Sequence, residues 1–423
     1  MAKTFRDWDV EQRWLLPPSV MDFVPADHIA HFIRDTVREQ LDLSEILAPY
    51  EKEERGYPPY NPVMMTALLL YAYCQGVYSS RRIARGCEER MDFMAVTGLN
   101  RPDFRTVSDF RKRHLDALQG LFVQVLSLCQ KAGLVKLGHV SLDGTKVKAN
   151  ASKHKAMSYE RMRETEKRLR QQVREWFHQA KSADEAEDRR HGGARRGDEM
   201  PQWVADKQQR IAKIREAREA LEAQARAAGQ TAPEPKAQRN FTDPESRIMR
   251  KSGKEYVQGY NAQAAVDSEA QVIVAHSLSN SATDVQQLAP ILKQIKHNTG
   301  RQAKEFSADA GFCSEGNLAV LAHHHVDSYI ATGRQRHHET SATGRRRTQG
   351  TRVAMMRTKL AQGARRSRYR LRKSVVEPVF GQIKQARGFR QFMLRGIQKV
   401  QGEWSLICTV HNLLKLAKAM KTP

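Results

Sequence analysis

The chain has 423 residues, with 71 Lys or Arg against 47 Asp or Glu, and a formal net charge of +24. This exceeds what solubility requires and indicates a polyanionic partner, of which nucleic acid is the commonest. A merely basic or ribosome-associated protein fits less well, because 40% of the residues are hydrophobic and indicate a folded body rather than a basic tail.

The sequence also bears on the compartment. No apolar run approaches the roughly 20 residues that span a bilayer, and charged residues interrupt the N-terminus where a signal peptide would be apolar. The five cysteines are widely spaced, odd in number and without a C-x2-C pair, which supports neither a disulfide framework nor a zinc site. We expect a cytoplasmic, nucleoid-associated protein with reduced thiols and no membrane contact.

Residues 1–115 predict a helical N-terminal domain. Residues 28–47 carry apolar side chains at near-helical spacing. Residues 64–74 are almost wholly apolar and long enough for a buried helix, which we expect to form the core of this domain.

Two basic segments follow, at residues 79–85 and 101–114, and helix-turn-helix-like DNA binding is their functional interpretation. A solvated basic helix face explains the second segment equally well. The side chains expected to contact DNA in this domain are Arg81, Arg82, Arg105, Arg111, Lys112 and Arg113.

A short strand is predicted where Val140 and Leu142 alternate with polar neighbours, and Gly144 breaks the run. The tip of this strand would present Asp143 at a turn. A buried carboxylate is costly alone and is tolerated beside a cation. Asp143 therefore raises the expectation of a metal ion and of partner acids elsewhere in the chain.

Residues 158–228 change character. Two apolar stripes, one from Tyr159 to Trp176 and one from Ile211 to Leu221, run through otherwise charged sequence. Residues 182–201 between them are charged and Gly-rich. This pattern predicts two antiparallel helices joined by a flexible loop, in a helical, charged insertion at residues 153–250. The stripes are too short to require a coiled coil with another subunit.

Strands and helices alternate after the insertion. Together with the strand at Asp143 they predict an RNase-H-like α/β domain over residues 116–423, with acids at the tips of the first and fourth strands. The predicted order is a hairpin of strands at 260–266 and 271–278, a helix capped by residues 280–284, a strand ending at Asp309, a helix at 314–322 and a strand at 326–331.

A third acid is expected on a late helix that crosses beside these strand tips. Glu377 is the candidate, because it and Lys384 lie two turns apart on one face of residues 374–384. Pro378 is tolerated only in a first helical turn, which would place Glu377 near the helix start. There it could equally be a simple first-turn acid favoured by the helix dipole.

Three such carboxylates suit a two-metal site, because Mg2+ accepts one or two protein carboxylates and leaves positions open for phosphate and water. Any single strand-end Asp is more often a turn or cap residue. The joint placement of Asp143, Asp309 and Glu377 favours the metal site.

The sequence resembles the DDE transposases of bacterial insertion sequences over nearly its full length. The matching pieces are Leu-Asp143-Gly-Thr-Lys-Val-Lys-Ala-Asn-Ala, Gly259-Tyr-Asn-Ala-Gln-Ala-Ala-Val-Asp267, Ala-Asp309-Ala-Gly-Phe, and Val-Glu377-Pro-Val-Phe-Gly-Gln-Ile-Lys384. The broad group carries Tyr-x2-Arg-x3-Glu-x6-Lys around its glutamate. Glu377 and Lys384 fit this motif, whereas Lys373 and Arg370 stand at its Arg and Tyr positions, with Tyr369 and Arg372 each one place early.

The resemblance implies that Asp143, Asp309 and Glu377 are catalytic and hold two Mg2+ (or Mn2+) ions. It implies double-stranded DNA as substrate, both element ends and target, with a homodimer on the DNA, and it associates the N-terminal domain with terminal-repeat binding. Residues 334–373 contain 14 Lys or Arg and one acid, Glu339, which favours contact with the DNA backbone. The further DNA-binding candidates are Arg372, Lys373, Lys384 and Arg387.

The expected function is therefore metal-dependent DNA strand cleavage at terminal inverted repeats, followed by strand transfer. Two alternatives stay open. One is a metal-dependent nuclease that cuts without joining, and the other is a DNA-binding derivative that has lost catalysis.

Overall fold

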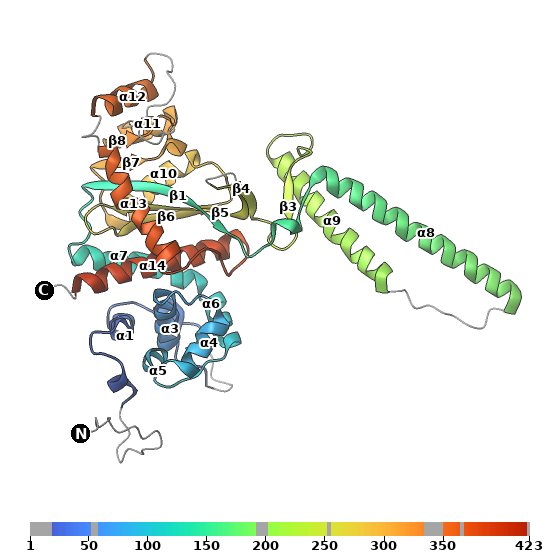
Figure 1. The fold of residues 1–423 in the computed structure, drawn as a ribbon, viewed down its shortest axis with the longest axis horizontal. Coiled ribbons are helices and arrows are strands. Elements are labelled where there is room, and N and C mark those ends of the chain that lie inside the picture. The colour runs from blue at the N-terminus through green and yellow to red at the C-terminus, as the bar shows by residue number, and fades with distance from the viewer. Residues whose placement is uncertain are drawn as a thin grey trace, which may run out of the picture.

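The structure is a computed structural model of the full chain. It describes residues 19–51, 58–191, 202–251, 255–333, 350–363 and 368–420, and for residues 180–191 the backbone only. Figure 1 shows a body of helices around one mixed sheet, with a helical hairpin projecting from it.

Short helices form the N-terminal part, as the sequence predicts. α3 is its centre: Asn61 accepts hydrogen bonds from the backbone at the first turn, Pro62 starts the helix, and every residue from Met65 to Cys74 is buried. The bounds are α1 Ile29–Glu39, α2 Ser44–Leu47, α3 Pro62–Cys74, α4 Ser80–Glu89, α5 Met91–Thr97 and α6 Phe104–Arg113.

A six-stranded mixed sheet forms the rest of the body. β5 pairs antiparallel with β1 on one side and with β4 and β6 on the other, and β7 continues from β1 in parallel, followed by β8. The predicted hairpin and the alternation of strand and helix after it are confirmed. The bounds are β1 His139–Lys148, β4 Arg247–Arg250, β5 Tyr256–Asp267, β6 Ile273–Ser279, β7 Glu305–Ala308 and β8 Asp327–Ile330.

The prediction that Gly144 ends the first strand is wrong. β1 continues to Lys148 because β5 pairs with it along nearly its whole length, from Val140 to Lys148. Its other neighbour, β7, pairs with it only as far as Leu142. Asp143 therefore lies inside β1, at the point where the sheet loses a strand on one side.

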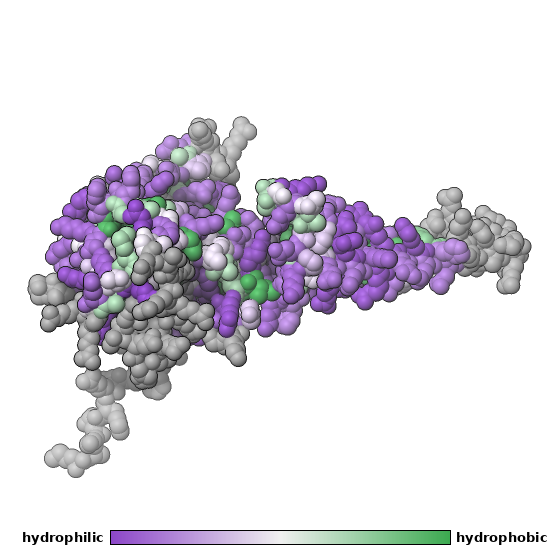
Figure 2. All heavy atoms as spheres, turned by 90° about the horizontal axis from the view of Figure 1, so that it is seen from above, coloured by the Kyte–Doolittle hydropathy of each residue, from purple (hydrophilic) through white to green (hydrophobic). Residues whose placement is uncertain are grey.

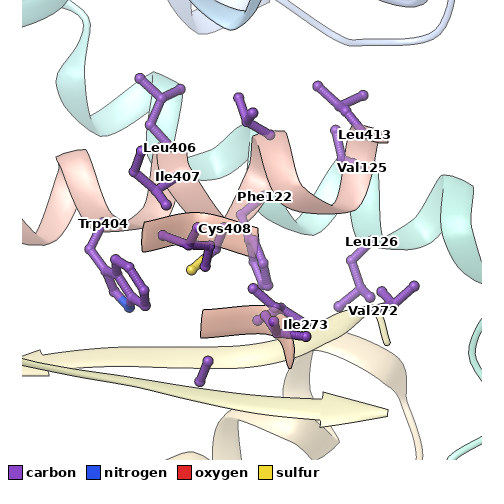
Figure 3. Close-up of a cluster of buried hydrophobic side chains, with 14 of the residues drawn as sticks. Phe122, Val125, Leu126, Val272, Ile273, Trp404, Leu406, Ile407, Cys408 and Leu413 are labelled. Atoms are coloured by element: carbon purple, nitrogen blue, oxygen red, sulfur yellow. The ribbon is translucent and has the colours of Figure 1, made fainter. Parts of the chain in front are cut away.

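Helices cover the sheet. α14 (Ile397–Met420) packs against α7 (Leu115–Lys131) and against β6. The Phe122 ring of α7 contacts His276 of β6, and Figure 3 shows Phe122, Trp404 and Ile407 above Ile273. α10 (Leu288–Thr299) lies along the outer edge of β6, where Gln294 accepts from the His276 amide and Asn298 donates to the Val274 carbonyl. α11 (Glu315–His323) connects β7 to β8.

The N-terminal helices share one hydrophobic core with the sheet and α14. α3 packs on α14, and the Tyr78 hydroxyl donates to the Arg387 carbonyl at 2.9 Å. A Cβ on Gly76 would lie 2.6 Å from that same carbonyl oxygen, so the two parts approach as closely as backbone allows.

The insertion is a helical hairpin of α8 (Tyr159–His191) and α9 (Gln202–Ala227), as predicted. Its base is a two-stranded sheet of β2 (Ala156–Ser158) and β3 (Gln238–Asn240). The two apolar stripes pack on each other as a small separate core, and the outer surface is largely hydrophilic (Figure 2). The predicted loop begins too early, because α8 continues through residue 191; residues 192–201 lie outside the described ranges.

The prediction that Glu377 lies near a helix start is also wrong. α13 runs from Leu371 to Gly381 with Pro378 inside it. A proline cannot donate to the carbonyl four residues earlier, and here the Gln271 side chain donates to the Ser374 carbonyl at 2.9 Å. That bond satisfies the group that Pro378 leaves without a partner. A π-helical turn, Gln382–Ala386, follows.

Among the described helices, none is long and apolar enough to cross a membrane.

Candidate active site

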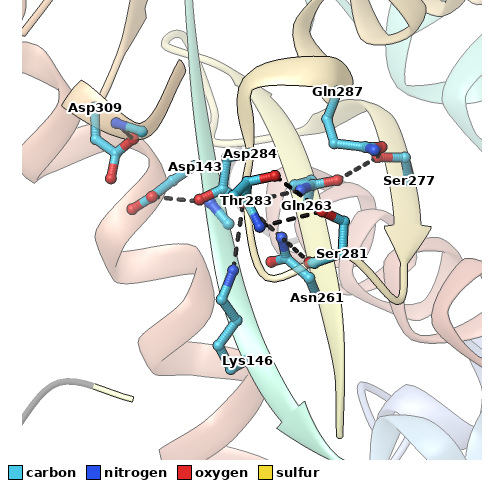
Figure 4. Close-up of polar contacts among 12 residues, drawn as sticks. Asp143, Lys146, Asn261, Gln263, Ser277, Ser281, Thr283, Asp284, Gln287 and Asp309 are labelled. Carbon is cyan, nitrogen blue, oxygen red and sulfur yellow. Dashed lines mark hydrogen bonds and ion pairs between the residues drawn. The ribbon is translucent and has the colours of Figure 1, made fainter. Parts of the chain in front are cut away.

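Two aspartates meet where β7 ends. Leu142 is in register with Ala308 in the parallel β1–β7 pair, so the next residues, Asp143 and Asp309, are neighbours by position. β1 continues there, whereas the chain after β7 turns away. The carboxylates of Asp143 and Asp309 point into the same region (Figure 4).

Backbone amides orient both carboxylates. Asp309 is the N-cap of a short 3-10 turn, Ala310–Phe312, and accepts from the Gly311 amide at 2.9 Å. Asp143 accepts from the Gly144 amide at 2.8 Å. These bonds fix one oxygen of each carboxylate and leave the other for a further partner.

Arg372 on α13 provides that partner for Asp143. Its Nη1 lies 2.7 Å from Asp143 Oδ2, and its Nη2 lies 2.9 Å from Glu377 Oε1. The Tyr369 ring lies beneath the same guanidinium, 6.0 Å away. The sequence predicts Arg372 as a DNA contact; the structure instead places it between two of the three predicted acids, joining Glu377 to Asp143.

Burial makes the carboxyl groups of Asp143 and Asp309 hard to ionise. Burial raises the pKa of Asp143 to about 6; Arg372 acts against this, and Asp309 adds to it. Burial also raises the pKa of Asp309, again against the effect of Arg372. A region of this kind favours positive charge, which Arg372 supplies in the structure.

The raised pKa of Asp143 predicts that, in the absence of divalent ions, the free energy of unfolding depends on pH. Asp143 is neutral in the folded protein below pH 6 and charged in the unfolded chain above about pH 4. The wild type should therefore lose stability relative to Asp143→Asn as the pH rises, by about 2 kcal/mol between pH 4.5 and 7.5. Urea unfolding of both proteins in EDTA at each pH measures this difference. A difference that stays constant or shrinks would mean that Asp143 is ionised in the folded protein throughout.

Lys384 reaches the same strand from the π-helical turn. Its amine contacts the Thr145 hydroxyl, two residues along β1 from Asp143. Burial lowers the pKa of Lys384 to about 8, with Lys251 acting in the same direction. Lys373, by contrast, is exposed on α13.

Two of the predicted DNA contacts are buried. Arg111 is 5% exposed and donates from Nη1 to the Tyr73 hydroxyl at 3.0 Å and to the Tyr78 carbonyl at 2.9 Å. Arg387 is 9% exposed, with His411 Nδ1 3.5 Å from its Nη2. Neither guanidinium can reach a phosphate in this structure, which corrects both predictions.

The remaining N-terminal candidates are exposed on α4 and α6. The guanidinium of Arg81 lies over the exposed Phe104 ring at 5.0 Å, and that of Arg105 lies 5.8 Å from the same ring. These contacts join the two helices into one basic surface, which consists of Arg81, Arg82, Arg105, Lys112 and Arg113. Residues 334–349 and 364–367 of the basic segment 334–373 lie outside the described ranges.

The donor set suits a hard divalent cation. Asp143, Asp309 and Glu377 offer only carboxylate oxygens, the ligands that Mg2+ and Mn2+ prefer. No group of three His, Cys, Asp or Glu side chains within the described residues is already arranged as a metal site. Arg372 explains this for the three acids, because its guanidinium separates Glu377 from Asp143.

A second polar cluster inside the sheet has the connections of a serine hydrolase triad. His139 contacts Glu305 Oε2 at 3.0 Å through Nδ1 and the Ser307 hydroxyl at 2.9 Å through Nε2, and Ser307 contacts Ser141 at 2.8 Å. Both serines are fully buried. No substrate can reach them, so the cluster is a structural network.

Sequence reasoning missed two charged residues beside the acids, Asp284 and Lys146. Figure 4 shows Asp284 near Asp143, with the amine of Lys146 joined to Asp284. Asp284 stands at the start of a helical segment, where an aspartate usually caps the helix, and Lys146 is one of several lysines after Asp143. The one sequence feature that could have placed Lys146 near the acids is its position three residues after Asp143.

Comparison with protein-family models gives two matches. Residues 18–113 match the family described as Transposase domain (DUF772), and residues 228–413 match Transposase DDE domain. The second match contains Asp309 and Glu377, and Asp143 precedes it. The comparisons with curated proteins and with solved structures found no match. The two matches together cover the N-terminal helices and most of the sheet, and the chain belongs to the DDE transposases of insertion sequences.

Proposed function

We propose that this transposase binds the terminal inverted repeats of its element, cleaves DNA strands there and joins the freed 3′ ends to target DNA. The observation that carries the proposal is the meeting of Asp143 and Asp309 at the end of β7, with Glu377 linked to Asp143 through Arg372. Three acids from three distant segments share one region. Chance caps and turns do not explain that convergence.

The sheet supports an RNase-H-like catalytic domain at residues 116–423. Its path β6-β5-β1-β7-β8 has three antiparallel strands followed by two parallel ones. Acids follow or lie within the two central strands, and the third comes from a late helix. DDE transposases generally use divalent metal ions, and two Mg2+ or Mn2+ ions are the expected complement.

Asp143, Asp309 and Glu377 would hold these ions, which when bound activate a water or a DNA 3′-hydroxyl and stabilise the leaving oxygen. Other residues of the chain would orient the acids, balance their charge and contact the DNA. Gly144 and Gly311 amides hold the aspartates in orientation. Arg372 balances the charge of Asp143 and Glu377. The amine of Lys384 lies at Thr145 of β1, two residues from Asp143, where it could contact a DNA phosphate.

The DNA-binding part of the proposal depends on the basic surface of α4 and α6. Five exposed side chains of one sign are enough to account for measurable electrostatic affinity for a duplex. Two element ends must be cut and joined in concert, so we propose a homodimer on DNA.

The test is cleavage and strand transfer on duplexes that carry the element's own ends, in Mg2+ or in EDTA. The wild type should cut and join only with the metal ion. Asp143→Ala should still bind the ends and do neither. Equal activity of the two proteins would contradict the three-acid site.

The same assay separates the rivals. A product that is cut but never joined to target DNA, at any ion concentration, would support a nuclease. Specific end binding by a wild type that neither cuts nor joins would support a DNA-binding derivative without catalysis.

A further inference from the structure

Asp284 lies near Asp309, and its carboxylate does not make the helix-capping bond that its position before a 3-10 turn would predict. It precedes the 3-10 turn Val285–Gln287 yet makes no side-chain cap there. Its Oδ1 instead accepts from Asn261 Nδ2 at 2.5 Å and from Gln263 Nε2 at 3.1 Å (Figure 4). Both amides are fully buried on β5. The sheet therefore fixes this carboxylate, at the cost of a helix cap.

Two glycines make room for it. A Cβ on Gly144 would lie 3.1 Å from Asp284 Oδ1, and a Cβ on Gly311 would lie 3.0 Å from Asp284 Oδ2. The same point at Gly311 is 3.0 Å from Asp309 Oδ1. The Asp284 carboxylate therefore lies between the β5 amides, Gly144 of β1 and Gly311 beside Asp309.

Lys146 is the charged partner of Asp284. Its amine lies 3.4 Å from Asp284 Oδ1, and its side chain is 16% exposed. Because side chains alternate along a strand, Lys146 leaves β1 on the face opposite to Asp143 and Thr145. Lys384 contacts Thr145 from the other face, so two amines approach the strand just beyond Asp143 from its two sides.

The charges of this region define what Lys146 can do. Arg372 pairs with Asp143 and Glu377, and Lys146 pairs with Asp284. A phosphodiester that approached Asp284 without that amine would be repelled by the carboxylate. A lysine that is free to rotate would supply charge only part of the time, whereas an ion pair in a mostly buried place restricts it. Asp284 uses one of the three donor positions of the amine, which leaves others for a phosphate oxygen.

We propose that Lys146 is a catalytic residue that contacts the reacting DNA phosphate, and that Asp284 is the positioning residue that holds its amine. This inference rests on the proposed strand cleavage. It adds a fourth acid and a lysine to the three acids, in the separate role of binding the substrate's phosphate.

The experiment compares four variants with the wild type on element-end DNA: Lys146→Gln, Lys146→Arg, Asp284→Asn and the double variant Lys146→Gln with Asp284→Asn. Lys148→Gln is the matched control, because Lys148 is the next lysine on β1 and is exposed. Single-turnover cleavage at saturating DNA and the Kd for the ends are measured separately. Thermal unfolding identifies any variant that is misfolded.

Lys146→Gln should slow cleavage by about 100-fold, as the loss of one fixed donor to a developing charge does, while the Kd stays within about threefold because many other contacts bind the duplex. Asp284→Asn should slow it by about tenfold, and Lys146→Arg should restore most of the rate. The double variant should be no slower than Lys146→Gln, since the two residues act as one unit. Lys148→Gln should match the wild type.

Cleavage by Lys146→Gln at the rate of Lys148→Gln would overturn the proposal, as would effects of Lys146 and Asp284 that multiply in the double variant. A slow Lys146→Arg with normal unfolding would assign Lys146 to packing rather than to charge. Failure of the proposed function has a different signature, because Asp143→Ala would then cut as well as the wild type.

Discussion

Glu377→Gln should reduce strand cleavage by at least about 10³-fold and leave end binding within about threefold. Glutamine has the same shape but cannot carry the charge that a divalent cation requires. The Glu377 side chain is 45% exposed, and within the described part of the chain its ion-pair partner is Arg372. The substitution should therefore leave the fold intact, which makes it a cleaner test of chemistry than the buried aspartates.

Gel-based cleavage of labelled end DNA, beside a binding titration on the same DNA, measures both quantities. Glu39→Gln, an exposed substitution at the end of α1, is the matched control and should behave as wild type. If Glu377→Gln cleaves DNA at the wild-type rate, Glu377 is not a catalytic residue and its ion pair with Arg372 has only a structural role.

Arg111→Ala should destabilise the protein by about 3–5 kcal/mol, rather than weaken DNA binding selectively. The Arg111 guanidinium is buried among Tyr73, Tyr78 and Ser80, all of which it contacts. Its removal leaves these polar groups without partners and opens space between α3 and α6. Urea unfolding followed by circular dichroism measures the loss.

The adjacent residues Lys112 and Arg113 supply the comparison. Both are exposed on the same turn of α6, so Lys112→Ala and Arg113→Ala should weaken end binding and flatten its salt dependence with stability within about 0.5 kcal/mol of wild type. If the free energy of unfolding of Arg111→Ala equals those of Lys112→Ala and Arg113→Ala, the hydrogen bonds of Arg111 do not contribute to stability.

Much of the fold followed from local patterns. The long apolar run of α3 predicted a buried helix, the alternation at Val140 and Leu142 predicted a strand, and the two apolar stripes predicted the helical hairpin. Asp143 and Asp309 were also expected close together, because each follows an apolar strand segment. The continuation of β1 past Asp143 was not predicted.

What the sequence did not reveal depends on contacts between distant segments. Pro378 is tolerated inside α13 only because Gln271, on the hairpin turn more than 100 residues earlier, donates to the exposed carbonyl. Asp284 is drawn away from its cap position by Asn261 and Gln263. In both cases a hydrogen bond from a distant segment replaces a local one, and the local sequence does not indicate this.

Arg111 is a different kind of error, because its spacing did contain a signal. Val107, Phe110, Arg111 and His114 fall at i, i+3, i+4 and i+7, which is the spacing of an inward face. All four are buried. A basic side chain on an apolar stripe should have been assigned to the interior and given a polar partner there.

The close packing of α3 on α14 would set the geometry of the proposed cleavage. The basic surface of α4 and α6 is attached to the sheet through a continuous core, and the Tyr78–Arg387 bond ties the two halves at the backbone. If DNA binding and cleavage proceed as proposed, the protein's own dimensions would set the number of base pairs between the bound sequence and the attacked phosphate. Inserting half a helical turn of DNA between them would turn the scissile phosphate to the far side of the duplex, beyond the reach of the acids.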